Sequence, residues 1–550
     1  MPGVLDRLDA GAVRRWAVDA LDRLRSHRDE IDGLNVFPVP DGDTGTNLCL
    51  TVESAVAAVE DVPDDDVREV ADALATGALH GARGSSGVIL SQLLQGWADA
   101  LREHPDGGAG AVRSALARAA DSAYAAVSRP SEGTMLSVAR AAADGASRGG
   151  TLREVVSGAL ASARAALDRT PNQLDELGRA GVVDAGGRGL LLVLESLAGT
   201  VAGRRAARRP AAGDPARSPA GEPGHGNDAP GGPPEVGGPW FEVMYLVDLP
   251  EDAVPLLRER LDRVGDSVVV VGGPVVAGGR TWRVHIHTAD VCAAVDAGAQ
   301  AGSGSSPGTA LAPNPAGTRP RTVRVTALVP PAASDPDRAR PSVGVVAVAS
   351  GPGLAQLLAA SGALALVRDA QGPPAPEDLL TAVRDTCAEA VVVLPDGPDA
   401  AATAEVAVAF AVQHGLRAAV VSARAPAQAL AAVAVYDPAG EPSEVLRRMA
   451  GVAAATRHGA VVLEPAVSPE PAATPEPAEE PTTPSGAVRG LVDDCVVTTG
   501  DDPAAVGRTV AERLLCDGGE LLTVISGAAP GAGTLAADLC RHVRETAPDV

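Results

Sequence analysis

The stretch Asn35-Val-Phe-Pro-Val-Pro-Asp-Gly-Asp-Thr-Gly-Thr-Asn47 joins two segments whose apolar residues recur at helical spacing. Before it, apolar residues from Val13 to Leu24 repeat three and four positions apart, which predicts an amphipathic helix. The two prolines of the stretch 35–47 stiffen the chain, and its two glycines permit backbone conformations that are closed to other residues. The stretch therefore predicts a rigid turn between two helices.

Asp41 and Asp43 stand one residue apart on this turn. Carboxylates held in this way suit Mg²⁺, which usually takes a few carboxylates together with phosphate oxygens and water. Thr44, Thr46 and Asn47 then open the next helix, whose free N–H groups favour a phosphate. The alternative is a turn that only caps a helix. So dense a run of proline, glycine, aspartate and threonine favours a magnesium–nucleotide site.

Two further glycine-rich loops precede apolar helices. In Gly81-Ala-Arg-Gly-Ser-Ser-Gly87, small residues would let backbone N–H groups approach a phosphate chain, and Arg83 could offset charge on a transferred phosphoryl group. The loop from Gly181 to Gly189 places Gly186 and Gly187 before another helix. Each loop alone could be an ordinary helix start. Together with the first loop they favour a nucleotide site.

Charge and composition restrict the chemistry. The chain has 550 residues and a formal net charge of −24, so we expect no nucleic acid partner and look instead to proteins, metal cations and small molecules. All 46 basic residues are arginine. A P-loop and a protein kinase both need a lysine on the phosphates, so both classes are excluded. Any phosphate chemistry must use arginine, backbone N–H groups, hydroxyls and metal.

The six cysteines are scattered without CxxC pairs, which indicates neither a disulfide framework nor a zinc ribbon and fits a reducing compartment. The N-terminus lacks the basic and apolar regions of a signal peptide. None of the apolar segments reaches the roughly 20 residues that a membrane helix requires. These features predict a cytoplasmic protein without an integral membrane segment.

Shifts in composition divide the chain. Residues 1–202 have helical periodicity almost throughout, which predicts an antiparallel all-α bundle or barrel. Residues 203–238 predict a flexible linker, and residues 239–330 a small α+β domain with a disordered insert at 302–321. Residues 342–466 alternate strand and helix, which predicts an α/β domain with a mostly parallel sheet. Residues 467–486 are a Pro/Glu linker, and residues 487–550 complete the C-terminal region.

The expected strands share short apolar or β-branched runs bounded by turn residues. They are Phe241–Val247, Ser267–Val271, Trp282–His287, Val343–Ala349, Ala363–Val367, Ala390–Leu394, Ala418–Val421 and Leu521–Ile525. On one of them, His285 and His287 alternate onto the same face, a spacing that suits two ligands of one metal such as zinc. They could equally be two histidines on a polar strand face, and both interpretations remain open.

The first loop resembles, almost letter for letter, a motif of the bacterial fatty acid kinase A family, whose nucleotide-binding domain is similar to that of dihydroxyacetone kinases (the DhaL-like domain). Other matching segments extend along the chain. They are Gly81–Gln92, with Ser85 where the family usually has Asn; Glu132–Val138; Gly181–Gly189, with Ala185 for a usual Ser; Arg283–Thr288; Val345–Gly353; and Val391–Pro395.

The resemblance implies a barrel of helices with Mg–ATP at one end. Asp41 and Asp43, helped by Asn35, would hold Mg²⁺. The second loop adds Arg83 to the two aspartates as a catalytic candidate. The remaining implied residues contact the nucleotide. They are Thr44, Thr46, Asn47, Gly84, Ser85, Ser86, Gly87, Thr134, Met135, Leu136, Asp184, Gly186 and Gly187. Since all of them precede residue 202, we predict that the helical domain binds Mg–ATP by itself.

The resemblance also implies an acceptor: a fatty acid carboxylate carried by a separate DegV-like lipid-binding partner, giving an acyl phosphate. The family's middle domain has a cysteine beside the two histidines, but Gly238-Pro-Trp-Phe-Glu-Val243 contains none, and the stretch after Arg457 aligns poorly. Two alternatives remain, a non-catalytic nucleotide-sensing scaffold and a dihydroxyacetone kinase-type subunit. A homodimer is compatible with the sequence.

Overall fold

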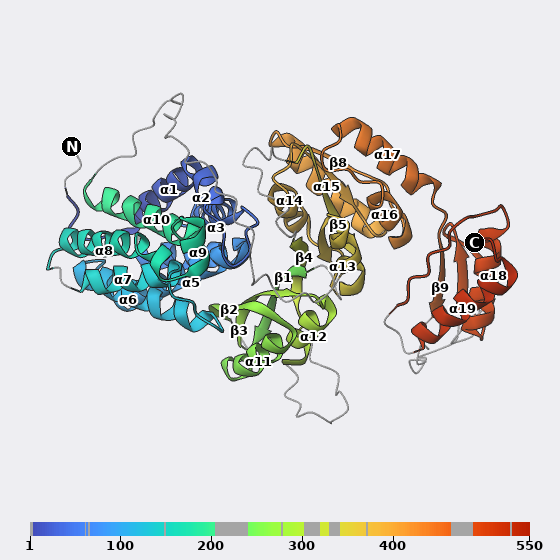
Figure 1. The fold of residues 1–550 in the computed structure, drawn as a ribbon, viewed down its shortest axis with the longest axis horizontal. Coiled ribbons are helices and arrows are strands. Elements are labelled where there is room, and N and C mark those ends of the chain that lie inside the picture. The colour runs from blue at the N-terminus through green and yellow to red at the C-terminus, as the bar shows by residue number, and fades with distance from the viewer. Residues whose placement is uncertain are drawn as a thin grey trace, which may run out of the picture. The chain divides into compact units, whose positions relative to one another are not determined.

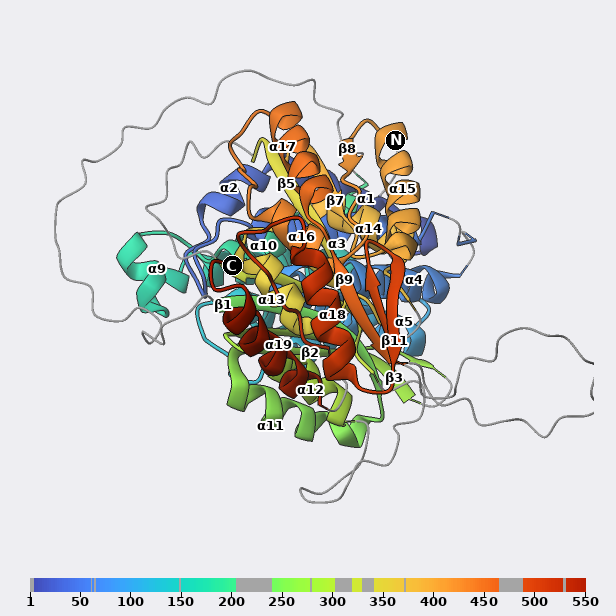
Figure 2. The ribbon, with the colours of Figure 1, turned by 90° about the vertical axis from the view of Figure 1, so that its right-hand side faces the viewer.

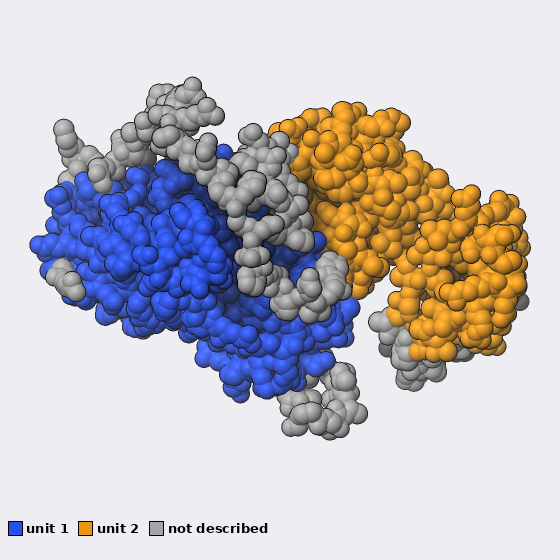
Figure 3. All heavy atoms as spheres, in the orientation of Figure 1, with its two compact units in different colours: residues 1–338, 365–369 blue, residues 339–364, 370–550 orange. Residues whose placement is uncertain are grey.

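The computed structural model describes residues 4–60, 62–63, 66–147, 150–203, 240–276, 279–301, 319–328, 341–369, 372–463, 488–527 and 531–550. The chain separates into two compact units (Figure 3), residues 1–338 with 365–369 and residues 339–364 with 370–550. The predicted linkers 203–238 and 467–486 and the predicted insert 302–321 lie outside the described residues, apart from a few residues at the ends of 203–238 and 302–321. No described helix is both long and apolar enough to cross a bilayer.

The first part of unit 1 is helical, as predicted (Figure 1). Its core is built mainly from alanine, valine and leucine, with Trp16 and Trp97 in contact at a ring-centroid distance of 4.8 Å. The Trp16 Nε1 donates to the Val193 carbonyl at 3.0 Å, which joins the first and last long helices. The helices are α1 Ala10–Ser26, α2 Arg28–Gly33, α3 Thr44–Ala58, α4 Val67–Gly81, α5 Gly84–Glu103, α6 Ala109–Ala126, α7 Met135–Ala146, α8 Leu152–Leu167, η1 Thr170–Asn172, α9 Asp175–Ala180 and α10 Ala185–Val201.

The rest of unit 1 is an α+β domain with an antiparallel sheet in the order β2-β3-β1-β4. The three predicted strands of this region are present, together with β4, which the sequence analysis did not predict. Residues 365–367 of β6 pair antiparallel with β4. The elements are β1 Trp240–Leu249, η2 Glu251–Ala253, α11 Val254–Val264, β2 Gly265–Val276, β3 Gly279–Thr288, α12 Val291–Ala301, β4 Arg321–Leu328 and β6 Leu364–Val367.

The sheet of this middle domain packs against helices α4 and α5. Leu79, Ala82 and Val88 form an apolar cluster with Met244 and Val271. Beside that cluster, the Arg283 guanidinium donates to the carbonyls of His80 and Ala82. The chain after α6 also joins the sheet, because Val127 forms a β-bridge with Val269, and the Ser128 N–H donates to the Val268 carbonyl at 3.1 Å. These contacts fix β2 next to the loop that connects α6 with α7.

Unit 2 contains the predicted α/β fold. Strands β5, β7 and β8 are parallel, and a helix follows each of them. Every residue of β5 is buried, as expected for a strand covered on both faces. The elements are β5 Val343–Ala349, α13 Pro352–Ala360, α14 Pro376–Asp385, β7 Ala390–Leu394, α15 Pro398–Gln413, β8 Arg417–Val420, α16 Pro426–Val433 and α17 Pro442–Ala455.

The chain ends in a small antiparallel sheet in the order β11-β10-β9, with α18 packed on it (Figure 2). The predicted strand Leu521–Ile525 is wrong. Its residues form no strand in the described chain, and Leu521 is 83% exposed. A strand needs a neighbouring strand to pair with its backbone groups, and the described chain offers none here. The elements are β9 Gly459–Leu463, β10 Val488–Val492, β11 Cys495–Gly500, α18 Pro503–Leu515 and α19 Ala532–Thr546.

Candidate nucleotide and metal site

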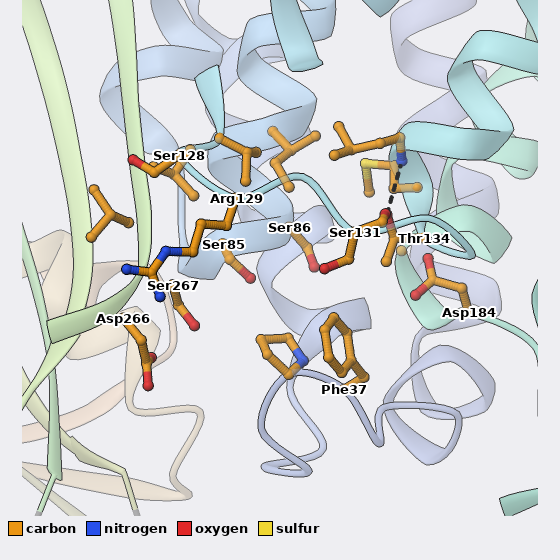
Figure 4. Close-up of a pocket in the computed structure, with 18 of the residues that line it drawn as sticks. Phe37, Ser85, Ser86, Ser128, Arg129, Ser131, Thr134, Asp184, Asp266 and Ser267 are labelled. Carbon is orange, nitrogen blue, oxygen red and sulfur yellow. Dashed lines mark hydrogen bonds between the residues drawn. The ribbon is translucent and has the colours of Figure 1, made fainter. Parts of the chain in front are cut away.

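One pocket of unit 1 lies between the ends of several helices and strand β2 (Figure 4). It contains about 910 Å³ of empty space, part of which is open solvent. Its wall is formed by Phe37, Pro38, Thr44, Ser85, Ser86, Ile89, Val127, Ser128, Arg129, Ser131, Thr134, Met135, Leu136, Asp184, Gly186, Asp262, Asp266, Ser267, Val268 and Val269.

The predicted glycine-rich loops meet at this pocket. Helices α3, α5, α7 and α10 all begin at it, and each start contributes residues to the wall. The positive dipole ends of helix starts favour anions, so their convergence suits a chain of phosphates. The predicted contacts in the wall are Thr44, Ser85, Ser86, Thr134, Met135, Leu136, Asp184 and Gly186; Thr46, Asn47, Gly84, Gly87 and Gly187 lie in the same loops outside it.

The loop before α3 brings the three predicted metal ligands together. Asn35 is buried, and its Nδ2 donates to Asp41 Oδ1 at 2.6 Å. Gly42, between the aspartates, has a φ of +70°, which favours glycine and sets the turn. Asp43 occupies the N-cap of α3, but its side chain makes no capping hydrogen bond. Its carboxylate therefore caps no backbone N–H of the helix, which suits a metal ligand.

The charges around this loop favour a cation. Burial raises the pKa of Asp41, and the neighbouring charge of Glu242 raises it further. The pKa of Asp43 is raised well above its usual value by burial and then by the charges of Asp41 and Glu242. Glu242 belongs to β1, so the middle domain adds a third carboxylate near the two aspartates. A bound divalent cation would offset this repulsion.

Asp32 holds the start of α3, and the sequence analysis missed it. Its Oδ1 accepts from the Thr46 N–H at 3.0 Å, and its Oδ2 accepts from the Thr46 hydroxyl at 2.9 Å. Gly45 lets helices α2 and α3 approach each other, since a Cβ at this position would lie 2.4 Å from the Arg28 carbonyl oxygen. Burial raises the pKa of Asp32, and the Thr46 hydrogen bonds oppose that rise. The groups of Thr46 predicted to hold phosphate are thus used within the protein.

Arg83 is buried rather than exposed to the pocket. It is 6% exposed, and its Nη1 donates to the Ala82 carbonyl at 2.8 Å. Its backbone N–H donates to Thr51 Oγ1, which bonds in turn to the Asn47 carbonyl. Arg83 is absent from the wall described above, so its predicted contact with a phosphoryl group has no support from this placement.

Asp184 closes the opposite end of the pocket from Arg129 (Figure 4). Its Oδ2 accepts from the Gly187 N–H at 2.7 Å and caps α10, while Thr134 caps α7. The Asp184 N–H donates to the hydroxyl of Thr170, which is fully buried. Burial raises the pKa of Asp184 to about 6, against hydrogen bonds from the N–H groups of Gly187 and Met135. Asp184 therefore couples the starts of two helices at the end predicted to hold the base.

His285 and His287 share one strand face, as predicted, with ring centroids 4.9 Å apart, and Glu242 completes a cluster with them. One potential ligand atom from each lies within 4.8 Å of the others. Burial would raise the pKa of Glu242, but His285, His287 and Arg324 hold it at about 2, and burial lowers the pKa of His287 to about 3.

The hydrogen bonds of His285 fit a metal ligand. Its Nδ1 donates to the Ser267 carbonyl at 3.1 Å, which would leave Nε2 as the ligand atom, 3.0 Å from Glu242 Oε1. Two imidazoles and a carboxylate form a donor set that zinc accepts. Glu242 stands in the stretch where the family has a cysteine, so the sequence did not mark it as a ligand. Whether zinc binds here stays a prediction.

Three family models match consecutive parts of the chain. Residues 38–199 match the DAK2 domain, residues 238–306 the middle domain of fatty acid kinase A-like (FakA-like) proteins, and residues 344–550 the C-terminal domain of the same proteins. The chain belongs to the fatty acid kinase A-like family. This membership confirms the family predicted from the loops. The fold class predicted for each part is confirmed as well. The DAK2 match identifies the helical domain as a kinase-type nucleotide-binding domain.

Relatives in this family match over nearly their whole length. Protein YloV of Bacillus subtilis is 27% identical, covering 94% of this chain and 92% of that protein. Uncharacterized protein SSP1546 of Staphylococcus saprophyticus is 26% identical, covering 100% and 97%. Among solved structures, the dihydroxyacetone kinase from C. freundii in complex with AMP-PNP and Mg²⁺ is 22% identical over 36% of this chain and 34% of that chain, with a TM-score of 0.28.

Proposed function

We propose that this protein is the ATP-binding component of a two-protein fatty acid kinase. It would transfer the γ-phosphoryl group of Mg–ATP to the carboxylate of a fatty acid held by a DegV-like partner, giving an acyl phosphate and ADP. The observation that supports this most is the pocket at which four helix starts converge beside the Asn35, Asp41 and Asp43 cluster. Membership of the fatty acid kinase A-like family supports the choice of acceptor.

Each group has a role in this proposal. Asn35, Asp41 and Asp43 would hold Mg²⁺, which when bound neutralises charge on the phosphates. Thr44, Ser85 and Ser86 would contact the phosphates. At the other end, Thr134, Met135 and Asp184 would enclose the base, with Met135 and Leu136 supplying apolar surface. The side chains therefore position the nucleotide, and positioning with charge neutralisation is most of what phosphoryl transfer requires.

The acceptor needs little activation. A carboxylate is ionised at pH 7, so no general base must remove a proton from it. The carboxylates near the pocket have raised pKa values because of burial, but none of them is required for proton transfer in this scheme. The wall of the pocket mixes polar, charged and apolar side chains, which suits an acyl chain poorly, so the acyl chain would remain on the partner. Unit 2 is the part of this chain that we propose as the docking surface for the partner.

The test is acyl phosphate formation by the purified full chain. The assay combines the chain, Mg–ATP, a fatty acid and a candidate DegV-like protein, and it measures ADP and hydroxylamine-trapped acyl groups. Omission of the partner or of Mg²⁺ should abolish the product. Dihydroxyacetone as acceptor should give no ADP above background. Phosphorylation of that ketose would favour the dihydroxyacetone kinase alternative, and tight nucleotide binding without any transfer would favour a nucleotide-sensing scaffold.

A further inference from the structure

The charges in the wall of the pocket are unevenly distributed. Its described wall residues include three carboxylates, Asp184, Asp262 and Asp266, and a single basic side chain, Arg129. The sequence contains no lysine, so a cation for phosphate must be arginine or metal. ATP carries about four negative charges at pH 7, and one Mg²⁺ offsets only two of them. A basic side chain in this wall would therefore offset part of the remaining negative charge of the phosphates.

The backbone of Arg129 is fixed, while its side chain is free to act. The preceding residues, Val127 and Ser128, are tied to β2 by the bridge to Val269 and the hydrogen bond to Val268. The Arg129 side chain is exposed, and within the described chain it forms neither a hydrogen bond nor an ion pair. Figure 4 shows it extending away from Ser86 and Asp184, toward Asp266 and Ser267. Because the guanidinium has no hydrogen bond or ion pair within the described chain, it can bind an anion without first losing one.

Its place along the pocket identifies the anion. In Figure 4, Arg129, Ser85, Ser86 and Asp184 follow one another across the pocket in that order. Asp184 marks the end proposed for the base, and the two serines begin α5, where the phosphates would lie. Arg129 therefore lies beyond the inner phosphates, on the side of the terminal one. Arg83, the arginine first expected there, is buried on the Ala82 carbonyl.

We propose that Arg129 is a catalytic residue that binds the γ-phosphoryl group of ATP during transfer, a role that rests on the function proposed above. In this step the bond between the γ-phosphorus and the β–γ bridging oxygen breaks, and its electron pair leaves with ADP. A carboxylate oxygen of the acceptor forms the new bond to phosphorus, and no proton is transferred. The Arg129 N–H groups donate to the non-bridging oxygens, which guanidinium geometry suits.

The test compares nucleotides that differ only in the terminal phosphate. Calorimetric titration of the full chain and of Arg129→Gln uses Mg–ADP and a non-hydrolysable Mg–ATP analogue. We expect the variant to lose about 10- to 100-fold in affinity for the analogue, as for a hydrogen bond to a charged group, and little for ADP. Transfer to the acceptor should fall about 10²- to 10³-fold. Arg129→Lys keeps the charge and should recover part of both losses.

Arg153→Gln is the matched control, because Arg153 is an exposed arginine of α8 outside the pocket wall and should change neither measurement. Equal loss of affinity for ADP and the analogue in Arg129→Gln would overturn the proposal, and so would an unchanged transfer rate. A lower unfolding temperature in Arg129→Gln together with no recovery in Arg129→Lys would show a structural role. Absence of nucleotide binding by the unaltered chain is a separate result that would refute the proposed function itself.

Discussion

Two clusters of potential metal ligands lie near one another in unit 1 but are built in different ways. The Asn35, Asp41 and Asp43 cluster comes from one continuous loop, stiffened by proline and set by Gly42. The Glu242, His285 and His287 cluster comes from two strands, and it exists only because β1 pairs with β3 in the register that places Glu242 opposite His287. The first cluster can be recognised from sequence, whereas the second cannot be completed without the sheet.

The loop cluster (Asn35, Asp41 and Asp43) and the strand cluster (Glu242, His285 and His287) also interact electrostatically. The charge of Glu242 raises the pKa values of Asp41 and Asp43, while His285 and His287 hold the pKa of Glu242 low. Glu242 therefore supplies a negative charge beside Asp41 and Asp43. We therefore expect the Asn35, Asp41 and Asp43 cluster to bind the metal and the Glu242, His285 and His287 cluster to adjust that site, so substitutions in the two clusters should differ in the size and kind of their effects.

The largest expected effect is the loss of either loop carboxylate. Asp41→Ala or Asp43→Ala should lower Mg²⁺-dependent transfer by about 10³-fold or more, since a bound metal contributes several kcal/mol to such a step. The helical domain should stay folded, because Asp41 lies on a loop and the Asp43 side chain caps nothing. Steady-state ADP release and helical circular dichroism measure the two outcomes. Asp22→Ala, an exposed change on α1, is the control; equal turnover in all three variants would refute the metal assignment.

Substitution in the strand cluster should have a smaller effect of a different kind. His285→Ala or His287→Ala should reduce transfer by about 100-fold, as expected for groups that adjust a metal site, while affinity for Mg–ADP changes little. The reason is that both histidines act on the loop aspartates only through the charge of Glu242. Zinc analysis of the purified variants shows whether a metal is lost as well. Loss of nucleotide binding equal to that of the aspartate variants would remove the distinction between the clusters.

Asp32 should affect the loop cluster only through position. Asp32→Ala removes both hydrogen bonds to Thr46 at the start of α3. A supporting residue of this kind should lower apparent Mg²⁺ affinity by about 10-fold, with a loss of roughly 1 kcal/mol of stability from the helix cap. Titration of Mg²⁺ at saturating nucleotide measures the first effect. Recovery of full activity at high Mg²⁺ is expected; a loss that Mg²⁺ does not restore would place Asp32 in the chemical step.

The last expected effect is that of Asp184 on stability and its pH dependence. Burial raises its folded-state pKa to about 6 from 3.8, so the protonated form favours folding, and that contribution is lost as pH rises through about 6. Asp184→Asn avoids the buried charge, so relative to the unaltered chain its stability should rise with pH, by roughly 3 kcal/mol at most. Urea unfolding at pH 4.5 and 7.5 tests this, with exposed Asp168→Asn as control. A pH-independent difference would contradict it.

The sequence alone determined the helical domain, the strands β1, β2, β3, β5, β6, β7 and β8, and the loops of the nucleotide site. These features depend on local periodicity, proline and glycine, which act over a few residues. The family membership followed from the same loops. The prediction of a strand at Leu521–Ile525 was wrong. The residues have the composition of a strand, but a strand also needs a partner strand, which composition does not reveal.

Only the tertiary structure decided which side chains face the pocket. It buried Arg83, brought Arg129 into the wall, placed Asp32 on Thr46 and added Glu242 to the two histidines. It also placed β2 of the middle domain in the wall, although every loop predicted to bind the nucleotide lies before residue 202. Such contacts join residues far apart along the chain. Their energies depend on distance, burial and hydrogen-bond geometry, which no local pattern of residues contains.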